Sequence, residues 1–501
     1  MTYGVPTLPD FTERSPRLAT LVGWPVNLLL ILALLYLLML DPPPRHGVNA
    51  VFALGAVGIW RWSWAILHFI RGAIFRRLVF PRIRRQAAAA PKPVHLYMLV
   101  TSYHMSAELN AAVYKRVFEE VRDYGVAATV VACITDPADV TVLEAIFRHV
   151  GGLPEGTSLI FSPQRGRGKR DAMARALVEI GRGQPLPGSL VVLMDGDTVL
   201  GSGALALTCQ VMAADPRLGA ATTENIPLVR GSTLTREWYR LRMAQRDNLM
   251  CSLALSRKLL VLTGRFSVFR AEIAADPEFA LALENDTVQH WRFGRLKMVT
   301  GDDKSTWYLV LRRGWDMLYV PDAVIYPMEE LPAGSFPAAT RALMVRWFGN
   351  MVRNSSRAIR LGPRAVGLFP WWCFVDQRLS MWTPLIGPIS ILTLTVLQGT
   401  GFLWAYLLWI YVSRTVMCAA LWAATGRLHP IFPLLLYYTQ ITSAVLKIVM
   451  TFHPYRQRWT RQAVGAGVSD PETALRDFTS GVLNVLFVAL FVSVVVLFVI
   501  T

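Results

Sequence analysis

Two aspartates separated by one glycine follow an apolar run in the middle of the chain. Asp195, Gly196 and Asp197 come directly after Leu190–Met194. Carboxylates at this spacing suit a hard divalent cation, because Mg²⁺ prefers oxygen ligands and keeps substrate phosphates in its shell. An ordinary acidic turn has the same composition, so the triplet by itself leaves both interpretations open.

A basic, glycine-containing segment, Gly166–Asp171, precedes the aspartates. Its glycines let the backbone approach a ligand, and the helix that we expect to begin there favours anions at its N-terminus. Lys169 and Arg170 add charged donors. The segment lacks the G-x-x-x-x-G-K-[ST] pattern of a Walker A loop. We expect an anion site; the alternative interpretation of the same residues is a solvated basic loop.

A second acidic pair, Asp302 and Asp303, follows Met298–Gly301. Adjacent carboxylates beside an apolar run can provide a general base, and their mutual repulsion raises the pKa of one of them. Alternatively, Asp303 caps a helix predicted over Ser305–Leu311. The two roles are compatible.

Four short apolar runs alternate with helical patterns between the basic N-terminal region and the first aspartates. The runs are Val94–Thr101, Ala127–Ile134, Ser158–Phe161 and Leu190–Met194, and the predicted helices are Ala107–Tyr124, Asp139–Val150 and Lys169–Ile180. Apolar strands separated by helices predict a parallel sheet covered on both faces. Ligands of such sheets bind beyond the carboxyl ends of the strands. Asp136, after the second run, is therefore a further candidate.

The composition indicates that much of the chain lies in a membrane. Of the 501 residues, 53% are hydrophobic and 17% are charged, with a formal net charge of +17, whereas soluble proteins have about 25% charged residues. The mean hydropathy is +0.38, which excludes a disordered or fibrous chain. The five cysteines form no C-x-x-C pair, so we expect isolated buried thiols instead of a zinc site or a disulfide framework.

Five apolar segments are predicted to cross the bilayer. They are Leu18–Leu40, Gly47–Ile70, Met381–Val396, Gly401–Ala424 and Gly481–Ile500. The first lacks a small-residue cleavage site and is expected to remain as an anchor. Ile431–Phe452 is ambiguous because it is rich in polar residues and precedes a basic loop. The positive-inside rule favours an interfacial helix there; otherwise the segment is a sixth span.

A cluster of arginines without acidic neighbours follows the second apolar segment. Its members are Arg71, Arg76, Arg77, Arg82, Arg84 and Arg85. The positive-inside rule places the cluster, and with it the N-terminus, in the cytoplasm. Attraction to anionic lipid heads fits the cluster as well. Since no basic motif interleaved with aromatic residues is visible, we expect no nucleic-acid partner.

The order of these motifs resembles that of the processive family 2 inverting glycosyltransferases, which include cellulose, chitin, hyaluronan and alginate synthases. The resemblance covers nearly the whole chain. The strings most similar to the catalytic subunit of bacterial alginate (mannuronan) synthases are Gly168–Asp171, Asp195–Leu200, Thr300–Ser305, Arg346–Asn350, Asp376–Arg378, Ser380–Trp382 and Trp459–Gln462. One departure is Leu343, which stands where the family's Q-x-x-R-W motif has its glutamine. This puts the glutamine's contact to the donor or acceptor in doubt.

The resemblance implies an α/β catalytic domain of the GT-A type, inserted between N-terminal and C-terminal transmembrane helices. It places the protein in the bacterial inner membrane, with the catalytic domain in the cytoplasm. The expected divisions are residues 1–80 for two transmembrane helices and their basic exit, 81–335 for the catalytic domain, 336–378 for interfacial helices with the R-W motif, and 379–501 for the C-terminal membrane region with a cytoplasmic loop near 453–478.

The resemblance also implies roles for individual residues. Asp303 would be the general base, with Asp302 beside it, and Asp197 would ligate Mg²⁺ or Mn²⁺. The donor would be bound by Asp136 (with Asp139 as the alternative), Lys169, Arg170, Asp195, Arg346 and Trp347. The acceptor would lie by Thr263, Gly264 and Arg265, and a gating loop would contain Trp459, Thr460 and Arg461. Arg61 and Arg414, which are costly in lipid without a role, would serve translocation.

The implied reaction transfers mannuronate from GDP-mannuronate to a growing polyuronate, giving a β-1,4 polymannuronate that crosses the membrane. Only one apolar segment follows Asp477, which leaves no room for a C-terminal cyclic-dinucleotide-binding barrel. The resemblance therefore implies a separate co-polymerase subunit in the membrane that binds cyclic di-GMP. Basic residues near the expected acceptor region could pair uronate carboxylates, although a basic membrane protein has such residues without this role. They are Arg257, Lys258, Arg265, Arg270, Arg312 and Arg313.

Two other functions remain open from the sequence. One is an enzyme that makes another exopolysaccharide or places a single sugar on a lipid carrier; Arg346–Trp347 and the following spans favour a polymer. The other is a transporter or scaffold with an inactive nucleotide fold. The presence of Lys169, Asp195, Asp197 and Asp303 argues against that function.

Overall fold

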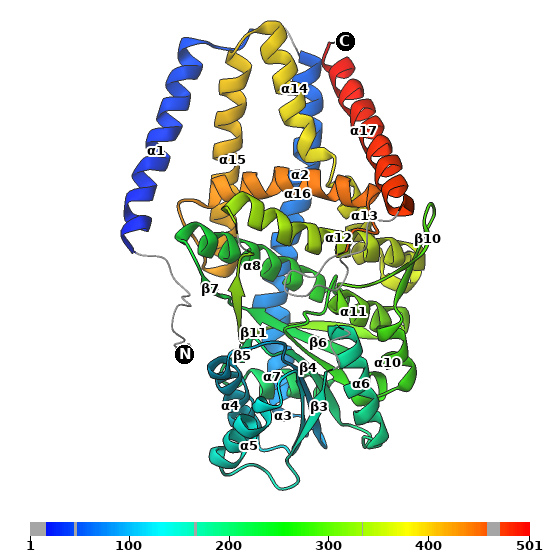
Figure 1. The fold of residues 1–501 in the computed structure, drawn as a ribbon. Helices are drawn as coiled ribbons and strands as arrows, with labels where there is room; N and C mark the ends of the chain where they lie inside the picture. Colours follow the sequence, from blue (N-terminus) through cyan, green and yellow to red (C-terminus); the bar gives the residue numbers. More distant parts are fainter. Residues whose placement is uncertain (1–16, 45–47, 165–167, 333, 458–470, 501) are drawn as a thin grey trace.

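The molecule consists of a bundle of long apolar helices above a mixed α/β domain, with two helices lying between these parts (Figure 1). The computed structural model describes residues 17–44, 48–164, 168–332, 334–457 and 471–500. The predicted fold class, an α/β domain between N-terminal and C-terminal apolar helices, is confirmed.

The first half of the sheet is parallel, as predicted. Strands β1 (Leu96–Thr101), β2 (Ala128–Ile134), β3 (Ser158–Pro163) and β4 (Leu190–Asp195) lie in the order β3-β2-β1-β4. Thr101 is in register with both Cys133 and Asp195. The carboxyl ends of these strands therefore meet at one edge, which brings the polar residues after them together.

The second half of the sheet was not predicted. It adds β5 (Thr198–Leu200), β6 (Leu218–Asn225), β7 (Leu228–Arg230), β8 (Phe266–Arg270) and β11 (Asp316–Glu330). β8 runs antiparallel between β4 and β6, and β11 continues the sheet in parallel with β6. A separate two-stranded sheet joins β9 (Thr287–His290) and β10 (Gly294–Lys297). The sheet is consequently mixed, although its first four strands are all parallel.

Helices cover the sheet on both faces. They are α4 (Ala107–Tyr124), α5 (Ala138–Val150), α6 (Lys169–Arg182), α7 (Ala204–Ala214), α9 (Ala271–Ala274), α10 (Pro277–Glu284) and α11 (Asp302–Arg312). α4 has the predicted bounds. It begins where the Ser106 hydroxyl accepts from the Leu109 amide, and it ends at Gly125 with φ of +67°. The core between sheet and helices is apolar, and the strands β1, β2 and β4 are almost entirely buried.

Five helices stand roughly side by side at the opposite end of the molecule (Figure 1). They are α1 (Arg17–Leu40), α2 (Val48–Ile74), α14 (Thr383–Gln398), α15 (Gly401–Thr425) and α17 (Pro471–Ile500). α16 (Phe432–Phe452) is also long and apolar enough to cross a membrane, and so is the segment Leu368–Gln398, which includes α13 (Leu368–Leu379). Over its described residues, α2 is not among the helices found long and apolar enough to cross a membrane. It contains Arg61.

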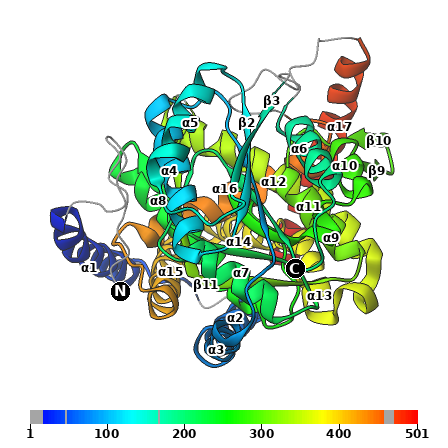
Figure 2. The same cartoon turned by 90° about the horizontal axis from the view of Figure 1, so that it is seen from below.

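The orientation of α16 differs from that of the upright helices. Figure 1 shows α16 lying across them, with α12 (Phe336–Val366) beneath it in a similar direction. This agrees with the interfacial interpretation of Ile431–Phe452. Of the six segments considered from the sequence, five are upright in the structure and one is crosswise. The view from below shows α12 and α16 behind the strands of the sheet (Figure 2).

The arginine cluster after the second apolar segment has partners within the protein. It occupies the end of α2, a π-helical turn Phe75–Val79 and α3 (Phe80–Ala89). Arg76 is 2.5 Å from Asp247 of α8 (Thr233–Ala254), and Arg84 is 2.8 Å from Asp322. Part of this cluster therefore docks α2 and α3 on the α/β domain. The five cysteines are buried and unpaired, as predicted.

Candidate active site

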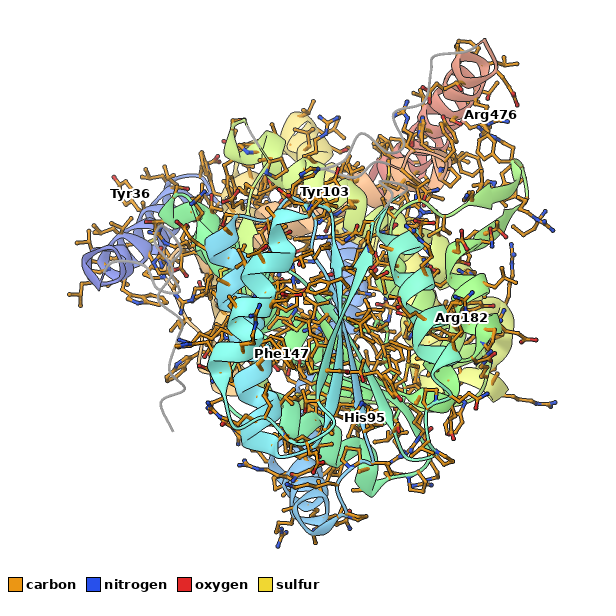
Figure 3. All side chains as sticks on the ribbon, turned by 60° about the horizontal axis from the view of Figure 1, so that its bottom comes forward. Tyr36, His95, Tyr103, Phe147, Arg182 and Arg476 are labelled. Carbon is orange, nitrogen blue, oxygen red and sulfur yellow. The ribbon has the colours of Figure 1, made fainter. Side chains whose placement is uncertain are left out.

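The edge formed by the carboxyl ends of the parallel strands faces the crosswise helices. Figure 3 shows Tyr103, which follows β1, at that edge, whereas His95, which precedes β1, lies at the opposite end of the sheet. Asp195 ends β4 at the same edge, because it is in register with Thr101. The site is therefore enclosed between the sheet and the helices α12 and α16.

Gly196 explains the spacing of the D-G-D triplet. Its amide donates to the Thr101 carbonyl at 2.8 Å. A Cβ at this position would lie 2.5 Å from the Ser102 hydroxyl and 2.8 Å from the Thr101 oxygen, so no larger residue fits without movement of the backbone. This close approach to β1 holds Asp195 and Asp197 on either side of one tight turn. The triplet is therefore a constrained part of the sheet edge and not a freely exposed acidic turn.

Lys169 joins the two acidic motifs. Its ammonium group lies 2.6 Å from Asp195 Oδ1 and 2.6 Å from Asp302 Oδ2. α6 begins at Lys169, as predicted, and Gly168 precedes it with φ of +101°. Burial, reinforced by the charges of Asp197 and Asp302 and opposed by Lys169, raises the pKa of Asp195 to about 6. Lys169 is thus part of the site, whereas residues 165–167 of the basic segment lie outside the described residues.

The second acidic pair occupies the first turn of α11. The helix begins at Asp302, with Gly301 at the N-cap in a left-handed conformation (φ +78°). The prediction that Asp303 caps a helix starting at Ser305 is wrong, because the helix begins three residues earlier. Both carboxylates nevertheless lie at the positive end of the helix dipole, where negative charge is stabilised.

The two carboxylates of this pair differ in their electrostatic environments. Burial disfavours the charge of Asp302, but Lys169 and Arg170 outweigh it and lower the pKa of Asp302. Burial and the negative charge of Asp302 raise the pKa of Asp303. Asp302 is nearly inaccessible, while Asp303 is partly exposed. Such a pair, with one carboxylate held ionised and a neighbour of raised pKa, suits general base chemistry at the second residue.

Arg170 supports this turn from behind. Its guanidinium donates to the Thr300 carbonyl at 2.9 Å, to the Ser305 hydroxyl at 2.9 Å and to the Leu283 carbonyl at 3.1 Å. The side chain is buried. Both of its terminal nitrogens hold residues around the start of α11, which is a positioning role, and its contact with the donor stays a prediction.

Asp286 is a buried carboxylate that the sequence did not single out. Arg357 of α12 donates to it at 2.8 and 3.0 Å, and the Ser305 hydroxyl also contacts it. Arg170 lies 3.8 Å away. This network ties the start of α11 to α12. The sequence does show an acidic residue directly before β9. The partners of Asp286 lie far away in the sequence, so its role in this network could not be predicted from it.

The Thr263–Arg265 loop lies against the acidic pair. A Cβ at Gly264 would lie 3.2 Å from the Lys169 ammonium and 3.3 Å from Asp302 Oδ2. The Thr263 hydroxyl accepts from Asn225 at the end of β6, and Arg265 forms an ion pair with Glu329 at the end of β11. All three residues predicted for the acceptor are therefore brought to the site. Their contact with a sugar stays a prediction.

The R-W motif of α12 faces the same place. Burial and the charge of Arg265 lower the pKa of Arg346, while Asp303 and Asp302 are near enough to act in the opposite direction.

Trp347 stacks on Trp238 of α8, with ring centroids 5.6 Å apart and planes within 7°. Leu343 is buried in the same apolar cluster. Leu343, which stands where the family has glutamine, therefore packs in an apolar cluster. Trp347 is part of the group of aromatic side chains beside the site.

Asn350 and Gln457 hold the segment that leads into Asp302. Asn350 accepts from the Thr300 hydroxyl at 2.8 Å, and Gly301 packs against its side chain. The Gln457 side chain accepts from the Val299 amide at 3.0 Å and donates to the Lys297 carbonyl at 2.8 Å. Trp459, Thr460 and Arg461 lie outside the described residues. Gln457, the last described residue before them, contacts the segment that leads into Asp302.

Asp136 lies at the same sheet edge but makes a local contact. It follows β2, is exposed, and accepts from the Ala138 amide at 2.9 Å at the start of α5. Asp139 accepts from Asn110 at 2.9 Å. Gln164, after β3, donates to the Ser102 and Cys133 carbonyls at 2.7 and 2.9 Å. Asp136 is thus the more accessible of the two aspartates that were considered for the donor.

The two arginines predicted for translocation have different surroundings. Arg61 of α2 forms a 2.5 Å ion pair with Asp376 of α13. Arg414 of α15 donates to Ser413 at 3.3 Å, and its electrostatic neighbours include Tyr406 and Tyr437. The pair with Asp376 gives Arg61 a structural explanation, so its transport role stays a prediction, as does that of Arg414.

The arginines considered for uronate recognition mostly serve the fold. Arg257 lies 2.5 Å from Asp215 and 2.7 Å from Asp316. Lys258 also pairs with Asp316, and Arg313 pairs with Asp276 at 2.6 Å. Arg270 donates to three backbone carbonyls. Arg265, by contrast, lies beside the acidic pair, because its neighbour Gly264 approaches Asp302.

The D-G-D edge could hold a divalent cation with help from a substrate. Asp195 and Asp197 offer hard carboxylate oxygens at one tight turn, and Mg²⁺ commonly takes its remaining ligands from phosphates and water. Among the described residues, no three His, Cys, Asp or Glu side chains form a ready-made metal site. The residues therefore fit a metal that binds together with a diphosphate.

The comparisons with known proteins agree with this geometry. Residues 91–350 match the family described as "Glycosyltransferase like family 2". Glycosyltransferase alg8 of Pseudomonas syringae pv. tomato is 40% identical over 443 residues, which cover 88% of this chain and 90% of that protein. Glycosyltransferase alg8 of Azotobacter vinelandii is 38% identical over 453 residues, which cover 89% and 92%.

One solved structure is also similar. It is the mannosyltransferase PcManGT from Pyrobaculum calidifontis in complex with GDP-Man and Mn²⁺. It is 17% identical, has a TM-score of 0.46, and the match covers 79% of this chain and 98% of that chain.

Proposed function

This chain belongs to the family 2 glycosyltransferases, and we propose that it polymerises mannuronate from GDP-mannuronate into β-1,4-linked polymannuronate and passes the polymer across the bacterial inner membrane. The observation that carries the proposal is its similarity to two alg8 glycosyltransferases over 88 and 89% of the chain. The position of the site supports it, because α11, which begins with the acidic pair, packs against α12, and Figure 1 shows α12 beneath the upright helices. A growing chain would have a short route into the bundle.

Asp303 is proposed as the general base that takes the proton from the acceptor hydroxyl. Its raised pKa and partial exposure support this role. Asp302 is held ionised by Lys169 and keeps the electrostatic potential negative around Asp303. With the proton removed, the acceptor oxygen attacks the anomeric carbon in line with the departing diphosphate. One displacement inverts the anomeric configuration, so no covalent enzyme intermediate is required.

Lys169 and Arg346 are proposed to stabilise the charge that develops on the leaving nucleoside diphosphate. Both are cations beside the acidic pair. Asp136 is proposed to contact the base or ribose, Asp195 the nucleotide, and Trp347 the donor. Thr263, Gly264 and Arg265 are proposed to border the acceptor. The loop with Trp459, Thr460 and Arg461 is proposed to close over the nucleotide, and the contact of the preceding residue Gln457 with Val299 supports this.

Asp197 is proposed to hold Mg²⁺ or Mn²⁺ beside the donor diphosphate. When bound, such an ion neutralises negative charge on the leaving group. The protein's own contribution is the close packing at Gly196, which fixes both carboxylates at the sheet edge.

The arrangement in the membrane is proposed from the charge pattern. The arginines after α2 favour a cytoplasmic α/β domain, and the divisions 1–80, 81–335, 336–378 and 379–501 are proposed for the chain. The loop near 453–478 would then be cytoplasmic. A separate membrane co-polymerase subunit that binds cyclic di-GMP is proposed as a partner.

A donor screen tests the proposed function. Membranes containing this chain, co-expressed with its neighbouring membrane proteins, are supplied with Mg²⁺ and one donor at a time. GDP-mannuronate is expected to give polymer, whereas UDP-glucose, UDP-GlcNAc, UDP-glucuronate and GDP-mannose are not. Membranes with Asp303→Asn provide the matched control. Polymer from another donor would contradict the substrate while leaving the family unchanged.

A further inference from the structure

A second set of basic side chains lies between the acidic pair and the membrane helices. Arg242 and Arg246 are four residues apart on α8, so they share one face of that helix. Lys447 is on α16, and Arg61 is on α2. The sequence did not single out Arg242, Arg246 or Lys447 as ligand-binding residues.

Arg242 and Lys447 approach the same aromatic ring. The Arg242 guanidinium lies 5.8 Å and the Lys447 ammonium 5.1 Å from the centroid of Phe348, which is two residues after Arg346. Arg242 and Arg61 are close enough to Lys447 to repel its charge. Three cations from three helices therefore converge above the R-W motif.

Arg246 connects this group to the catalytic residues. Its electrostatic neighbours include Arg265 of the proposed acceptor loop and Lys304, which follows Asp303. Its one hydrogen bond to a described residue is the 3.4 Å contact with the Thr223 carbonyl, and its buried Nη2 atom has no partner. The order from the site outward is thus Arg246, then Arg242 one helical turn away, then Lys447.

Arg61 is paired with Asp376, whereas carboxylates act on the other cations only at longer range, Asp247 and Glu224 on Arg246 and Asp376 on Lys447. Within the described part of the chain, Arg242, Arg246 and Lys447 form no ion pair, and the buried Nε of Arg242 has no hydrogen-bond partner. Burial lowers the pKa of Arg242 to about 10.

The nearby carboxylates are already engaged with other arginines. Asp376 pairs with Arg61, Asp247 with Arg76, and Glu224 with Arg427. Burying cations without partners is unfavourable, so an anionic ligand is expected to complete the group.

We propose that Arg246, Arg242 and Lys447 bind the carboxylates of the polyuronate as it leaves Asp303 toward the membrane helices. This inference rests on the proposed function and names the residues that recognise its product. The chain carries one carboxylate on every sugar, and a row of cations on neighbouring helices matches a ligand with repeated negative charge. Selection would follow from charge, because a neutral polysaccharide leaves the same cations unpaired.

Binding of oligosaccharides to the purified full-length chain in nanodiscs tests the proposal. The probes are a β-1,4 oligomannuronate and the neutral oligosaccharide obtained by reducing its carboxylates. Arg242→Gln and Lys447→Gln are each expected to weaken oligomannuronate binding about tenfold, as loss of one charged hydrogen bond would. The neutral probe is expected to bind weakly to all of the proteins. Lys447→Arg keeps the charge and is expected to bind like the wild type.

Lys115→Gln is the matched control, since Lys115 is an exposed cation on α4. GDP binding is measured for each variant to separate the polymer from the donor diphosphate, and nanodiscs with and without anionic lipid separate it from lipid head groups. The proposal is overturned if Arg242→Gln and Lys447→Gln bind oligomannuronate like the control, if they lose only GDP binding, or if the neutral probe binds equally well.

The assay uses no donor turnover, so it is independent of the donor screen. If GDP-mannuronate gives no polymer but charge-dependent oligouronate binding is observed, the proposed substrate fails and the anion-binding role of the cations stands. If GDP-mannuronate gives polymer but the variants bind oligouronate normally, the proposed function stands and this inference fails.

Discussion

The ammonium group of Lys169 lies 2.6 Å from a carboxylate oxygen of Asp302, although 133 positions separate the two residues in the sequence. The same ammonium lies 2.6 Å from Asp195. One lysine therefore joins the end of β4 to the start of α11. The two adjacent aspartates are unequal, because Lys169 stabilises the charge of Asp302, whereas burial and the charge of Asp302 raise the pKa of Asp303.

Replacing Asp303 with asparagine is expected to abolish polymer formation. The amide fills a similar volume but cannot accept the proton, so the rate should fall by roughly 10²- to 10⁴-fold. GDP binding should change little, since other side chains are proposed to hold the donor. Incorporation of labelled sugar and GDP affinity are the two measurements.

Asp123→Asn is the control for that variant, because Asp123 is an exposed carboxylate paired with Arg122 at the end of α4. It should elongate like the wild type. Normal elongation by Asp303→Asn would show that another group is the base.

The dependence of polymerisation on pH should reflect the raised pKa of Asp303. The base is active only when ionised, so activity is expected to fall as the pH drops through this raised pKa. The acidic limb of kcat/KM should consequently lie at higher pH than for an ordinary aspartate. GDP affinity measured over the same pH range excludes loss of donor binding as the cause. An acidic limb at the pH of an unperturbed aspartate would contradict the assignment.

Gly196→Ala is expected to disrupt the site by crowding. The added Cβ would lie 2.5 Å from the Ser102 hydroxyl and 2.8 Å from the Thr101 oxygen, so the D-G-D turn must move away from β1. Overpacking of this kind costs about 1–3 kcal/mol. Thermal unfolding in detergent and GDP affinity should both show the loss.

Gly481→Ala serves as the comparison, because nothing lies within 4 Å of a Cβ at Gly481. This substitution should leave both measurements near those of the wild type. If Gly196→Ala also left thermal unfolding and GDP affinity unchanged, the close packing would not be what positions Asp195 and Asp197.

Asp286→Asn is expected to destabilise the α/β domain strongly. Asp286 is buried and receives two hydrogen bonds from Arg357, at 2.8 and 3.0 Å. Removing one partner of a buried ion pair typically costs about 3–5 kcal/mol. The midpoint of thermal unfolding should therefore fall well below that of Glu284→Gln, which changes an exposed neighbour. Equal midpoints would mean that Arg357 finds another partner.

The parts of the fold that were predicted depend on sequence patterns within a single segment, whereas the parts that were missed depend on pairing between distant segments. β1, β2, β3 and β4 were predicted because each is a short apolar run between helical patterns. β8 (Phe266–Arg270) was missed because its place between β4 and β6 depends on antiparallel pairing over long sequence separations. β11 also could not be predicted from the sequence, because Pro321 and Asp322 interrupt its apolar pattern.

The site shows the same division between local and long-range information. The acidic motifs and the helix beginning at Lys169 are local features, and the structure brings them to one sheet edge. The roles of Arg170 and Arg257 depend on partners 42 to 135 residues away, and a count of basic residues cannot reveal such pairing. The enzymatic interpretation is confirmed by family membership, which removes the transporter or scaffold as an alternative.

The central claim is that this site builds a β-linked polyuronate by single inverting displacements from GDP-mannuronate. Proton NMR of the polymer, made by membranes containing the wild-type chain and its co-expressed membrane neighbours from GDP-α-mannuronate, tests it most directly. Polymannuronate with β-1,4 linkages is predicted, with none from the Asp303→Asn membranes. A polymer with α linkages, or one formed equally well by Asp303→Asn, would contradict the account.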